Sequence, residues 1–460
     1  MAVAFIPATA SASLLDPSSC FWSSAINVNT ANYSYPDAAS TYWYSGFNLP
    51  AGAKVVFRGS YPFSRYFSLQ SYGSSGAQSG IALDAIDDVQ ISPALLSFNP
   101  FRPGGLRYLP LRSYSVTLTG AQPPVAGGQR AANTLYAGTL PATSTQPVRL
   151  VYRVELPDRG FDDTGGVGLP SVTVVLASGQ QISGSAACST LGVSTVVTSL
   201  GSGLPLSTYL ALTRLPANPS IGASGSSPQA PAVNPIQWYR AVNACQELDP
   251  YYQAAGYPLN TPADGTPVCS NTFAVTNYQN VDNAYLSAYI NRSFGPDTTG
   301  NNVLVLTGQM PTIGGTYDNA LFFPANEQLR YWSLCTEESL YATTTTTSNG
   351  CLYDEQVPLN SSHDYTIVVS TAADRPTNAT TACGVGWLNW PSGDGAPAPY
   401  TRPDLGQLLM RNQLTSSSFT QAIQDVPAPG LPANVTTTMG PYAPTGQYES
   451  VAQFEAAGCR

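Results

Sequence analysis

The chain has 460 residues, of which only 10% are charged, against roughly 25% in an ordinary soluble protein. Its 18 basic and 27 acidic side chains give a net charge of −9, and Lys54 is the single lysine. Nucleic acid and anionic membrane surfaces are therefore disfavoured as partners, because both are bound by clusters of lysine and arginine. The length allows two or three domains with cores of their own.

Short strands dominate the first part of the chain. Val55, Val56 and Phe57 concentrate apolar residues in one expected strand, and residues 65–72 alternate as a half-buried strand should. Gly/Pro turns separate these segments, and helical periodicity is nearly absent. The pattern predicts an all-β fold of jelly-roll-like antiparallel β-sandwich type. The strands are expected at residues 42–48, 54–59, 65–72, 114–119 and 148–155.

The composition then shifts to Ser, Gly, Pro and Ala over residues 201–235, which is typical of a linker. Two helices are expected nearby, at residues 206–215 and, after Asn234-Pro235, at residues 236–247. The insert is therefore expected to be partly helical. Short C-terminal helices are expected at residues 416–426 and 448–457.

One hairpin motif occurs twice in the sequence. Residues 55–62 and 304–311 are both β-rich runs that end in Gly-x-x-Pro, and Arg-Tyr-aromatic-Ser-Leu follows at residues 65–69 and 330–334. The offset grows from 249 to 265, so the second copy carries 16 more residues between Thr312 and Leu329. Three later pieces follow in the same order, pairing residues 87–90 with 354–357, 114–117 with 365–368, and 151–153 with 409–411.

This repetition predicts a duplicated β-sandwich module. The expected organisation is a first module at residues 20–200, a linker and helical insert at 201–280, and a second module with a C-terminal tail at 281–460.

Several of these segments resemble a group of uncharacterised, mostly bacterial, secreted proteins built from paired β-sandwich modules of unknown function. The resemblance implies a fold and export but no activity. It is carried by Tyr66-Phe-Ser-Leu69, Tyr331-Trp-Ser-Leu334, Arg153, Arg411 and Trp387-Leu-Asn-Trp-Pro391.

Eight cysteines without a C-x-x-C pair favour four disulfides in an oxidising compartment over a zinc or redox centre. Nearness along the chain and shared modules suggest pairing Cys20 with Cys188, Cys245 with Cys269, Cys335 with Cys351, and Cys383 with Cys459. Five sequons agree with secretion if the host glycosylates. They lie at Asn32, Asn291, Asn360, Asn378 and Asn434.

The N-terminal stretch leaves two interpretations open. Residues 2–12 are apolar and end in small side chains, as in the tail of a signal peptide, but they also fit a mature N-terminus. No apolar run approaches the ~18 residues of a membrane span. We expect a secreted or surface-exposed protein.

The densest carboxylate group is Asp84, Asp87 and Asp88. Oxygen ligands in a loop suit calcium, and paired carboxylates serve glycoside hydrolysis; turn-capping aspartates are the plainer interpretation. Asp354 and Glu355 occupy the matching place in the second copy, which favours a structural role. Apart from calcium, the sequence suggests no cofactor.

Arginines recur at matched strand positions, Arg65 with Arg330 and Arg153 with Arg411. A guanidinium inside a sandwich needs a carboxylate or aromatic neighbour, so we expect ion pairs with the acidic loop of the same module. A ligand-binding pair at a module mouth is the alternative.

Other candidates are fewer. His363, the single histidine, could serve a Ser-His-Asp hydrolase, but no G-x-S-x-G elbow is present. Trp387, Trp390 and the Tyr251-Tyr252 pair are expected loop aromatics that could stack on sugars. The catalytic residues stay unknown. We expect a non-catalytic binding or assembly protein that contacts glycans or copies of itself; the alternative is an extracellular polysaccharide-active enzyme that uses loop carboxylates.

Overall fold

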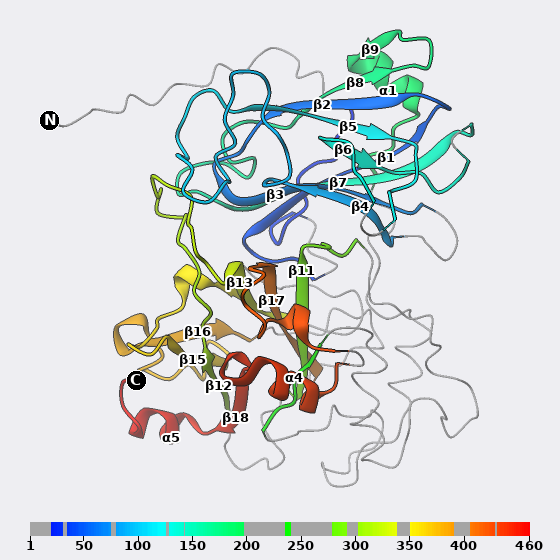
Figure 1. Cartoon of the computed structure of the whole chain (residues 1–460). Helices are drawn as coiled ribbons and strands as arrows, with labels where there is room; N and C mark the ends of the chain where they lie inside the picture. The colour runs from blue at the N-terminus through cyan, green and yellow to red at the C-terminus, as the bar shows by residue number, and fades with distance from the viewer. Residues whose placement is uncertain are drawn as a thin grey trace, which may run out of the picture.

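The computed structural model describes residues 20–30, 35–74, 80–125, 128–141, 143–196, 235–240, 278–291, 302–337, 350–390, 405–427 and 430–460. We call the described residues up to 196 the first half and those from 235 the second half. The chain is mostly β, with four sheets and a few short helices, as the sequence predicts (Figure 1). The helix expected at residues 206–215 lies outside the described residues.

The first half holds two sheets, with strand orders β1-β7-β3-β4 and β6-β5-β2-β8-β9. The helix α1 (Gly184–Leu191) follows the last strand. The strands are β1 (Ser40–Leu49), β2 (Lys54–Ser60), β3 (Ser64–Tyr72), β4 (Ala82–Asp87), β5 (Ser113–Thr119), β6 (Thr134–Tyr136), β7 (Gln146–Pro157), β8 (Ser171–Val175) and β9 (Gln181–Ser183).

The second half also holds two sheets, with orders β10-β11-β17-β13-β14 and β16-β15-β12-β18. The strands are β10 (Tyr239–Arg240), β11 (Asn283–Asn291), β12 (Val303–Gln309), β13 (Leu329–Glu337), β14 (Cys351–Tyr353), β15 (Asp364–Ser370), β16 (Val385–Asn389), β17 (Leu405–Thr415) and β18 (Thr445–Glu449). The helical elements are η3 (Asp354–Gln356), η4 (Thr381–Cys383), η5 (Ile423–Asp425), α4 (Pro432–Met439), η6 (Gly440–Tyr442) and α5 (Val451–Ala456).

Strand orders correspond between the halves. The order β1-β7-β3-β4 matches β11-β17-β13-β14, and β6-β5-β2-β8 matches β16-β15-β12-β18. The registers agree too, because Gly59 lies opposite Tyr114 and Gly308 opposite Tyr365. A Cβ atom added at Gly59 or Gly308 would lie 2.9 or 2.6 Å from the hydroxyl oxygen of that tyrosine. This close approach explains the glycine of the repeated Gly-x-x-Pro motif.

One edge of each half departs from the antiparallel expectation. The β5–β6 and β15–β16 pairs are parallel. In both halves a long loop, at residues 120–133 and 371–384, carries the chain back to the starting end of the sheet, which a parallel pair requires.

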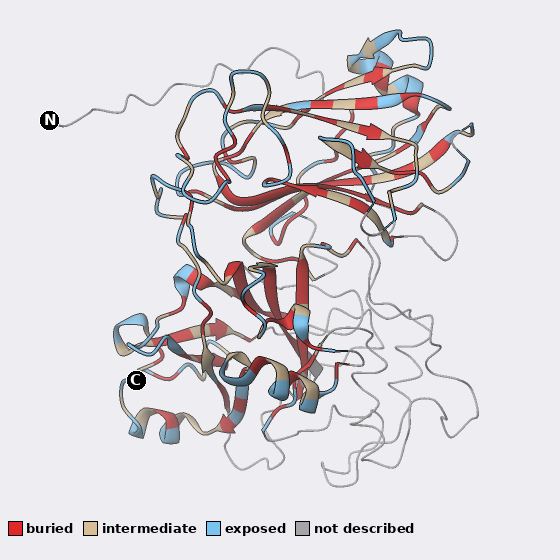
Figure 2. Cartoon of the chain, viewed as in Figure 1, coloured by how far each residue is buried: buried red, intermediate tan, exposed pale blue. Residues whose placement is uncertain are grey.

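The sheets of the first half lie above those of the second (Figure 1), and the two inner sheets, containing β3 and β13, contact each other at the boundary between the halves. Every residue of β3 and β13 is buried (Figure 2). The expectation of a half-buried strand at residues 65–72 is therefore wrong. Its apolar face fills the sandwich core, while its polar face, with Tyr66, Ser68 and Gln70, is covered by the other half.

The extra residues in the second hairpin explain part of this docking. Phe323 packs in the core of the first half against Phe101, with ring centroids 5.4 Å apart. Its N–H donates to the Gly105 carbonyl at 2.7 Å, and Arg107 N–H donates to the Leu321 carbonyl at 3.0 Å. The hairpin loop of the second half is thus bonded to the first half.

Two expected helices are corrected. The described residues Ile236 to Arg240 are extended rather than helical, because Tyr239–Arg240 pairs with β11 and Ile236 enters the core. Residues 416–426 contain only the 3₁₀ turn η5. In the last segment, 448–457, a strand ends at Glu449 before α5 begins.

Among the described residues, three disulfides are present at pairs that the sequence predicted. They join Cys20 to Cys188, Cys335 to Cys351, and Cys383 to Cys459. Cys245 and Cys269 lie outside the described residues. None of the helices in the described ranges is long and apolar enough to cross a membrane.

Candidate ligand-binding site

Arg65 lies at the start of β3 and is fully buried. Its Nη1 donates to both carboxylate oxygens of Asp354 at 3.2 Å, and its Nη2 bonds to Glu355. Asp354 belongs to the other half, so the expected pairing within one module is wrong. The inner sheets face each other, and the nearest carboxylate therefore lies across the boundary.

Arg330 makes the reciprocal contact. Its Nη1 donates to Oδ1 of Asp88, in the first half, at 3.0 Å, and its Nε donates to Glu327 at 3.0 Å. Asp88 also accepts the Phe67 N–H at 3.1 Å, as Asp354 accepts the Trp332 N–H at 3.2 Å. Asp88, rather than Asp87, is therefore the counterpart of Asp354, and the sequence match is one residue out of register there.

The second arginine pair also reaches across the boundary. Arg153 Nη2 donates to the Tyr278 carbonyl at 2.5 Å, and Arg411 Nη2 donates to the Tyr35 carbonyl at 2.6 Å. Both tyrosines have left-handed backbones, with φ of 61° and 56°. The short segments that precede β11 and β1 thus cross to the opposite half and bind its arginine. All four matched arginines stabilise the contact between the halves.

The three carboxylates proposed for calcium have separate partners. Asp84 accepts from Arg130 at 2.7 Å, Asp87 accepts the Gln90 N–H at 2.9 Å, and Asp88 faces Arg330. The structure does not bring them together as ligands of one ion. Among the described residues, the group with metal-ligand spacing is Asp37, Cys335 and Cys351, and there the two sulfurs are joined in a disulfide.

Burial makes this boundary unusual electrostatically. Desolvation raises the pKa of Asp88 to about 8 and that of Asp282 to about 6, against the opposing effect of Arg330. Desolvation, reinforced by the Asp37 charge, raises the pKa of Glu155 to about 7. Each increase of one in the pKa of a carboxyl group corresponds to about 1.4 kcal/mol of destabilisation of its ionised form. Burial at the boundary therefore disfavours these negative charges, and the neighbouring arginines offset part of that cost.

The other predicted candidates that the structure describes lie in separate surroundings. Trp390 is buried in the core of the second half, and Trp387 is half-buried with the Arg375 guanidinium 4.3 Å from its ring centroid. His363 is exposed in a turn with φ of 63°. Tyr251-Tyr252 lies outside the described residues.

The sequons also differ in their surroundings. Asn32 lies outside the described residues, and Asn291 ends β11. Asn360 is exposed, whereas Asn434 and Asn378 are half-buried.

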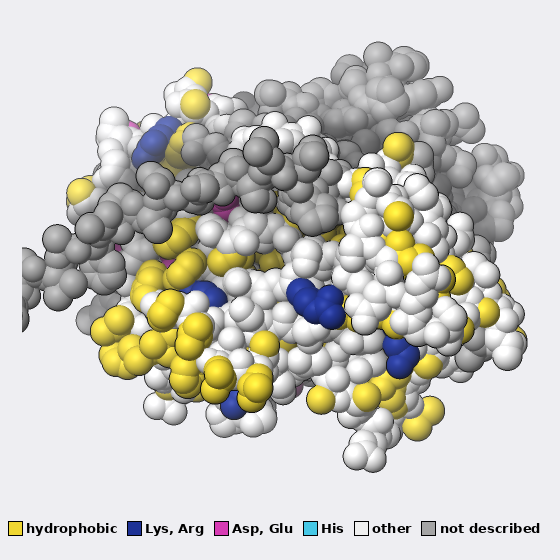
Figure 3. Space-filling view, turned by 90° about the horizontal axis from the view of Figure 1, so that it is seen from above, with side chains coloured by type: hydrophobic (Ala, Val, Ile, Leu, Met, Phe, Trp, Pro, Cys, Tyr) yellow, Lys and Arg dark blue, Asp and Glu magenta, His cyan; other side chains and the backbone are white. Residues whose placement is uncertain are grey.

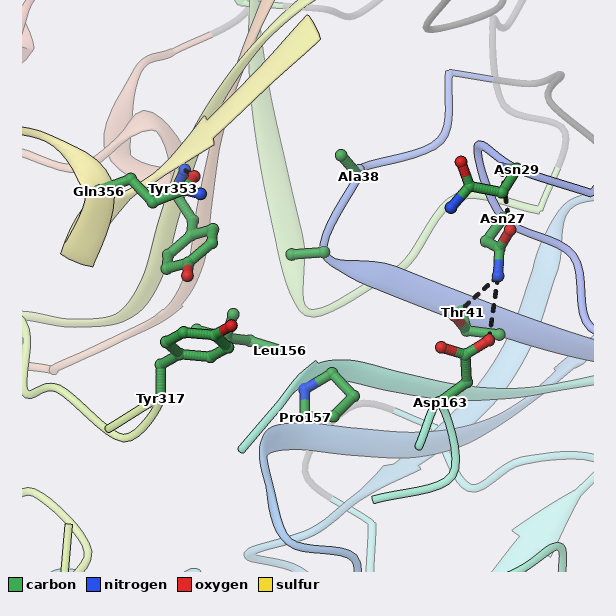
Figure 4. Close-up of a pocket in the computed structure, with 11 residues that line it drawn as sticks. Asn27, Asn29, Ala38, Thr41, Leu156, Pro157, Asp163, Tyr317, Tyr353 and Gln356 are labelled. Carbon is green, nitrogen blue, oxygen red and sulfur yellow. Dashed lines mark hydrogen bonds between the residues drawn. The ribbon is translucent and has the colours of Figure 1, made fainter. Parts of the chain in front are cut away.

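A pocket of about 250 Å³ opens where the halves meet (Figure 4). Its floor is Leu156 and Pro157, at the end of β7. None of the described lining residues is lysine or arginine. The lining consists of Asn27, Asn29, Ala38, Ala39, Thr41, Leu156, Pro157 and Asp163 from the first half and Tyr317, Tyr353 and Gln356 from the second.

One wall of the pocket is polar. Asn27 Nδ2 donates to Asp163 Oδ2 at 3.1 Å and to Thr41 Oγ1 at 3.3 Å. The Asn27 Oδ1 atom accepts the Asn29 N–H at 2.9 Å. These bonds fix the Asn27 amide, so that the Asp163 carboxylate is oriented beside the pocket. The exposed Asn29 adds a further amide (Figure 4).

The opposite wall is aromatic. The Tyr317 and Tyr353 rings lie 5.7 Å apart, centroid to centroid, at 59° (Figure 4). Burial raises the pKa of the Tyr353 phenol, which therefore stays protonated at neutral pH. Gln356, at the end of η3, contributes an amide beside the rings.

The ion pair between Arg65 and Glu355 holds this aromatic wall in place. Glu355 Oε1 accepts the N–H groups of Thr316 and Tyr317 at 2.8 and 3.0 Å. Glu355 itself bonds to Arg65, whose Nε donates to the Thr316 hydroxyl at 2.7 Å. Arg65, which the sequence singled out, therefore supports the pocket wall through Glu355 and Thr316 and is not itself a lining residue.

The aromatic and amide residues of the lining were not predicted from the sequence, whereas Asp163 belongs to an Asp162-Asp163 pair that is a weaker carboxylate candidate there. Tyr317 lies in the extra hairpin segment and Tyr353 directly precedes Asp354, so an aromatic residue next to each recognised feature was the available signal. Asn27 and Asn29 carried none, because their role depends on a contact with Asp163 from a distant loop.

The fold and the site define a mostly β protein of sandwich-like sheets that contains disulfides and has, between its halves, a pocket whose described lining residues include no lysine or arginine. No protein-family profile matches the chain, and no curated protein is significantly similar to it. Among solved structures, an uncharacterised protein from Burkholderia cenocepacia aligns with 92% of this chain and 80% of its own, at 11% identity and a TM-score of 0.45.

Two other structures align more weakly. An anti-sigma factor domain-containing protein covers 81% of this chain and 74% of its own at 8% identity, and the N-terminal region of an enterococcal surface protein covers 82% and 78% at 11% identity. Both have TM-scores of 0.15. None of these similarities is strong enough to support a function.

Proposed function

We propose that the protein is an extracellular, non-catalytic binding protein whose ligand is a neutral glycan. The observation that carries the proposal is the pocket in which Tyr317 and Tyr353 face a wall of amides and the Asp163 carboxylate. Amide and carboxylate groups supply the donors and acceptors that sugar hydroxyls need. Tyrosine offers an apolar ring face together with a polar tip.

The size and charge of the pocket narrow the ligand. Ligand pockets usually measure roughly 300–1,000 Å³, so about 250 Å³ suits one sugar ring at the end of a chain rather than a long segment. Without lysine or arginine in the lining, an anionic sugar would meet Asp163 and no counter-charge. A neutral terminal sugar fits this lining best.

The enzyme alternative is less well supported. Glycoside hydrolysis usually requires two carboxylates about 5 to 10 Å apart, and Asp163 is the single carboxylate among the residues that line this pocket. The carboxylates of the acidic segments are bonded to arginines or backbone N–H groups instead.

The proposal also includes export from the cell and the duplication of one module. Disulfides are typical of oxidising compartments, which supports a secreted or surface location. The matching strand orders and reciprocal arginine contacts support two modules descended from one jelly-roll-like sandwich, at residues 20–200 and 281–460 with the insert between them. A pocket between paired modules also agrees with the resemblance to secreted paired-sandwich proteins.

The test is a glycan-array screen followed by calorimetric titration of the best neutral oligosaccharide. Tyr353→Ala and Gln356→Ala should each weaken binding at least tenfold, which is about 1.4 kcal/mol. Trp387→Ala is the matched control, because that half-buried aromatic lies under Arg375 away from the pocket lining. No binding to any neutral glycan, or equal losses in all three variants, would refute the assignment.

A further inference from the structure

The first half exposes a large apolar surface beside the docked hairpin loop. Seven apolar side chains that are at least 40% exposed gather there, led by Leu95 at 93% and Leu96 at 78%. Figure 3 shows hydrophobic side chains concentrated over one corner of the molecule. We call Leu95, Leu96, Phe98, Leu106, Leu111, Leu321 and Phe322 the apolar patch.

Backbone bonds connect the parts of the patch. Phe98 N–H donates to the Leu111 carbonyl at 2.9 Å, Leu106 and Phe322 form a β-bridge, and Arg107 N–H donates to the Leu321 carbonyl. The patch therefore spans residues from both halves. It is continuous with the contact in which Phe323 enters the core of the first half.

Buried polar groups hold the patch in shape. Asn99 Nδ2 donates to the carbonyls of Asp88 and Ile91 at 2.7 and 2.9 Å. Arg112 donates to the Arg107 and Pro62 carbonyls at 2.8 and 2.9 Å. A loop anchored by buried side chains loses little further freedom when a partner covers it.

Charge helps to identify the partner. Residues 93–112 and 319–323 contain no aspartate or glutamate, although the chain carries a net charge of −9. Two copies that meet elsewhere on the acidic surface would repel each other, whereas contact between two patches brings no carboxylate of these segments together. An anionic lipid surface would meet one exposed arginine in these segments, Arg102, but would be repelled by the net charge of −9 that the whole molecule carries.

We propose that the apolar patch is the interface through which two copies of this chain form a two-fold symmetric dimer. A self-complementary apolar surface suits this symmetry, because each copy presents the same patch to the other. Exposed apolar surfaces of this kind mark interaction sites in soluble proteins. The dimer would leave each copy with its own pocket, so a polyvalent glycan would bind with avidity.

The test is sedimentation equilibrium of the full-length, disulfide-intact protein from about 1 to 100 μM, a range that detects micromolar dissociation constants. The wild type should approach twice the 48.3 kDa mass of one chain. The double variant L95S/F98S should raise the dissociation constant at least tenfold. Both side chains are exposed in the single chain, so thermal unfolding of the variant at low concentration should match the wild type.

The matched control is V125S/V196S, which removes two exposed valines outside the patch and should dimerise like the wild type. A wild type of single-chain mass throughout, or L95S/F98S dimers as tight as the wild type, would overturn the proposal. A last experiment measures co-sedimentation of the protein with phosphatidylcholine vesicles. Vesicle binding by a wild-type monomer that is lost in L95S/F98S would assign the patch to lipid instead.

Discussion

Replacing Arg65 with methionine should lower the free energy of unfolding by about 3–5 kcal/mol, the cost of removing one partner from a buried ion pair. The guanidinium is fully buried and contacts Asp354, Glu355 and Thr316. Without it, Asp354 keeps the Trp332 N–H, at 3.2 Å, but has lost its counter-charge. The Asp354 side chain is only 5% exposed, so water cannot replace the guanidinium.

The assay is chemical denaturation of the disulfide-intact protein, followed by tryptophan fluorescence. Arg159→Met is the matched control, because Arg159 pairs with Asp318 at 2.6 Å while both side chains are at least 64% exposed, and exposed pairs contribute about 0–1 kcal/mol. Adding Asp354→Leu to Arg65→Met should recover part of the loss by removing the orphaned carboxylate. Both pairs join the two halves, so equal effects of the two arginine substitutions would show that the buried Arg65–Asp354 pair contributes no more to stability than an exposed pair.

Two further predictions concern pH and glycosylation. Burial raises the pKa of Asp88 to about 8 from the usual 3.8. Between about pH 4 and pH 8, Asp88 therefore keeps its proton in the native chain but loses it in the unfolded chain. The free energy of unfolding should fall as the pH rises through that window. Melting temperatures should show this slope in the wild type and a shallower one in Asp88→Asn, with Asp318→Asn as control; a stability that rises with pH would contradict the assignment. In a glycosylating host, Asn378 should stay unmodified, because its Nδ2 donates to the Phe454 and Gly458 carbonyls, whereas the exposed Asn360 is free of such burial. Site mapping by mass spectrometry checks this, and full occupancy at Asn378 would show that the C-terminal helix does not dock as described.

Local patterns were enough to predict β1, β2, β3, β5 and β7 of the first half and three disulfide pairs. The alternation in residues 65–72 identified β3, since a strand places successive side chains on opposite faces whatever covers them. Cys335 and Cys351 lie directly opposite each other on β13 and β14, as expected of neighbours in one module. The alternation of polar and apolar residues cannot show what covers the polar face of β3. Tyr66 and Gln70 looked solvent-facing because hydroxyl and amide groups suit water and a polar boundary equally well.

The sequence also could not predict whether the ion pairs form within one half or between the two halves. Arg65 and Asp88 belong to one half, as do Arg330 and Asp354, so pairing within or between halves satisfies the same composition. Only the face-to-face arrangement of the inner sheets selects the crossed pairs. The offset of one residue between Asp87 and Asp88 arose because the sequence contains two adjacent aspartates, of which one accepts the N–H of β3.

The pocket lies where the two halves stop matching. The N–H of Leu156 donates to the Ala39 carbonyl, and the corresponding Leu414 N–H donates to the Asp282 carbonyl, so the floor is repeated on the other side of the boundary. The aromatic wall is not repeated, since Tyr317 belongs to the extra residues of the second hairpin.

Tyr353 is not repeated either. Its counterpart is Asp87, because Asp87 N–H bonds to Gln90 as Tyr353 N–H bonds to Gln356. A search for matched residues therefore finds the supports common to both halves and misses the wall that only one half supplies. The duplicated contacts account for the stability of the boundary, and the insertion that carries Tyr317, together with the unmatched Tyr353, accounts for the aromatic wall of the pocket.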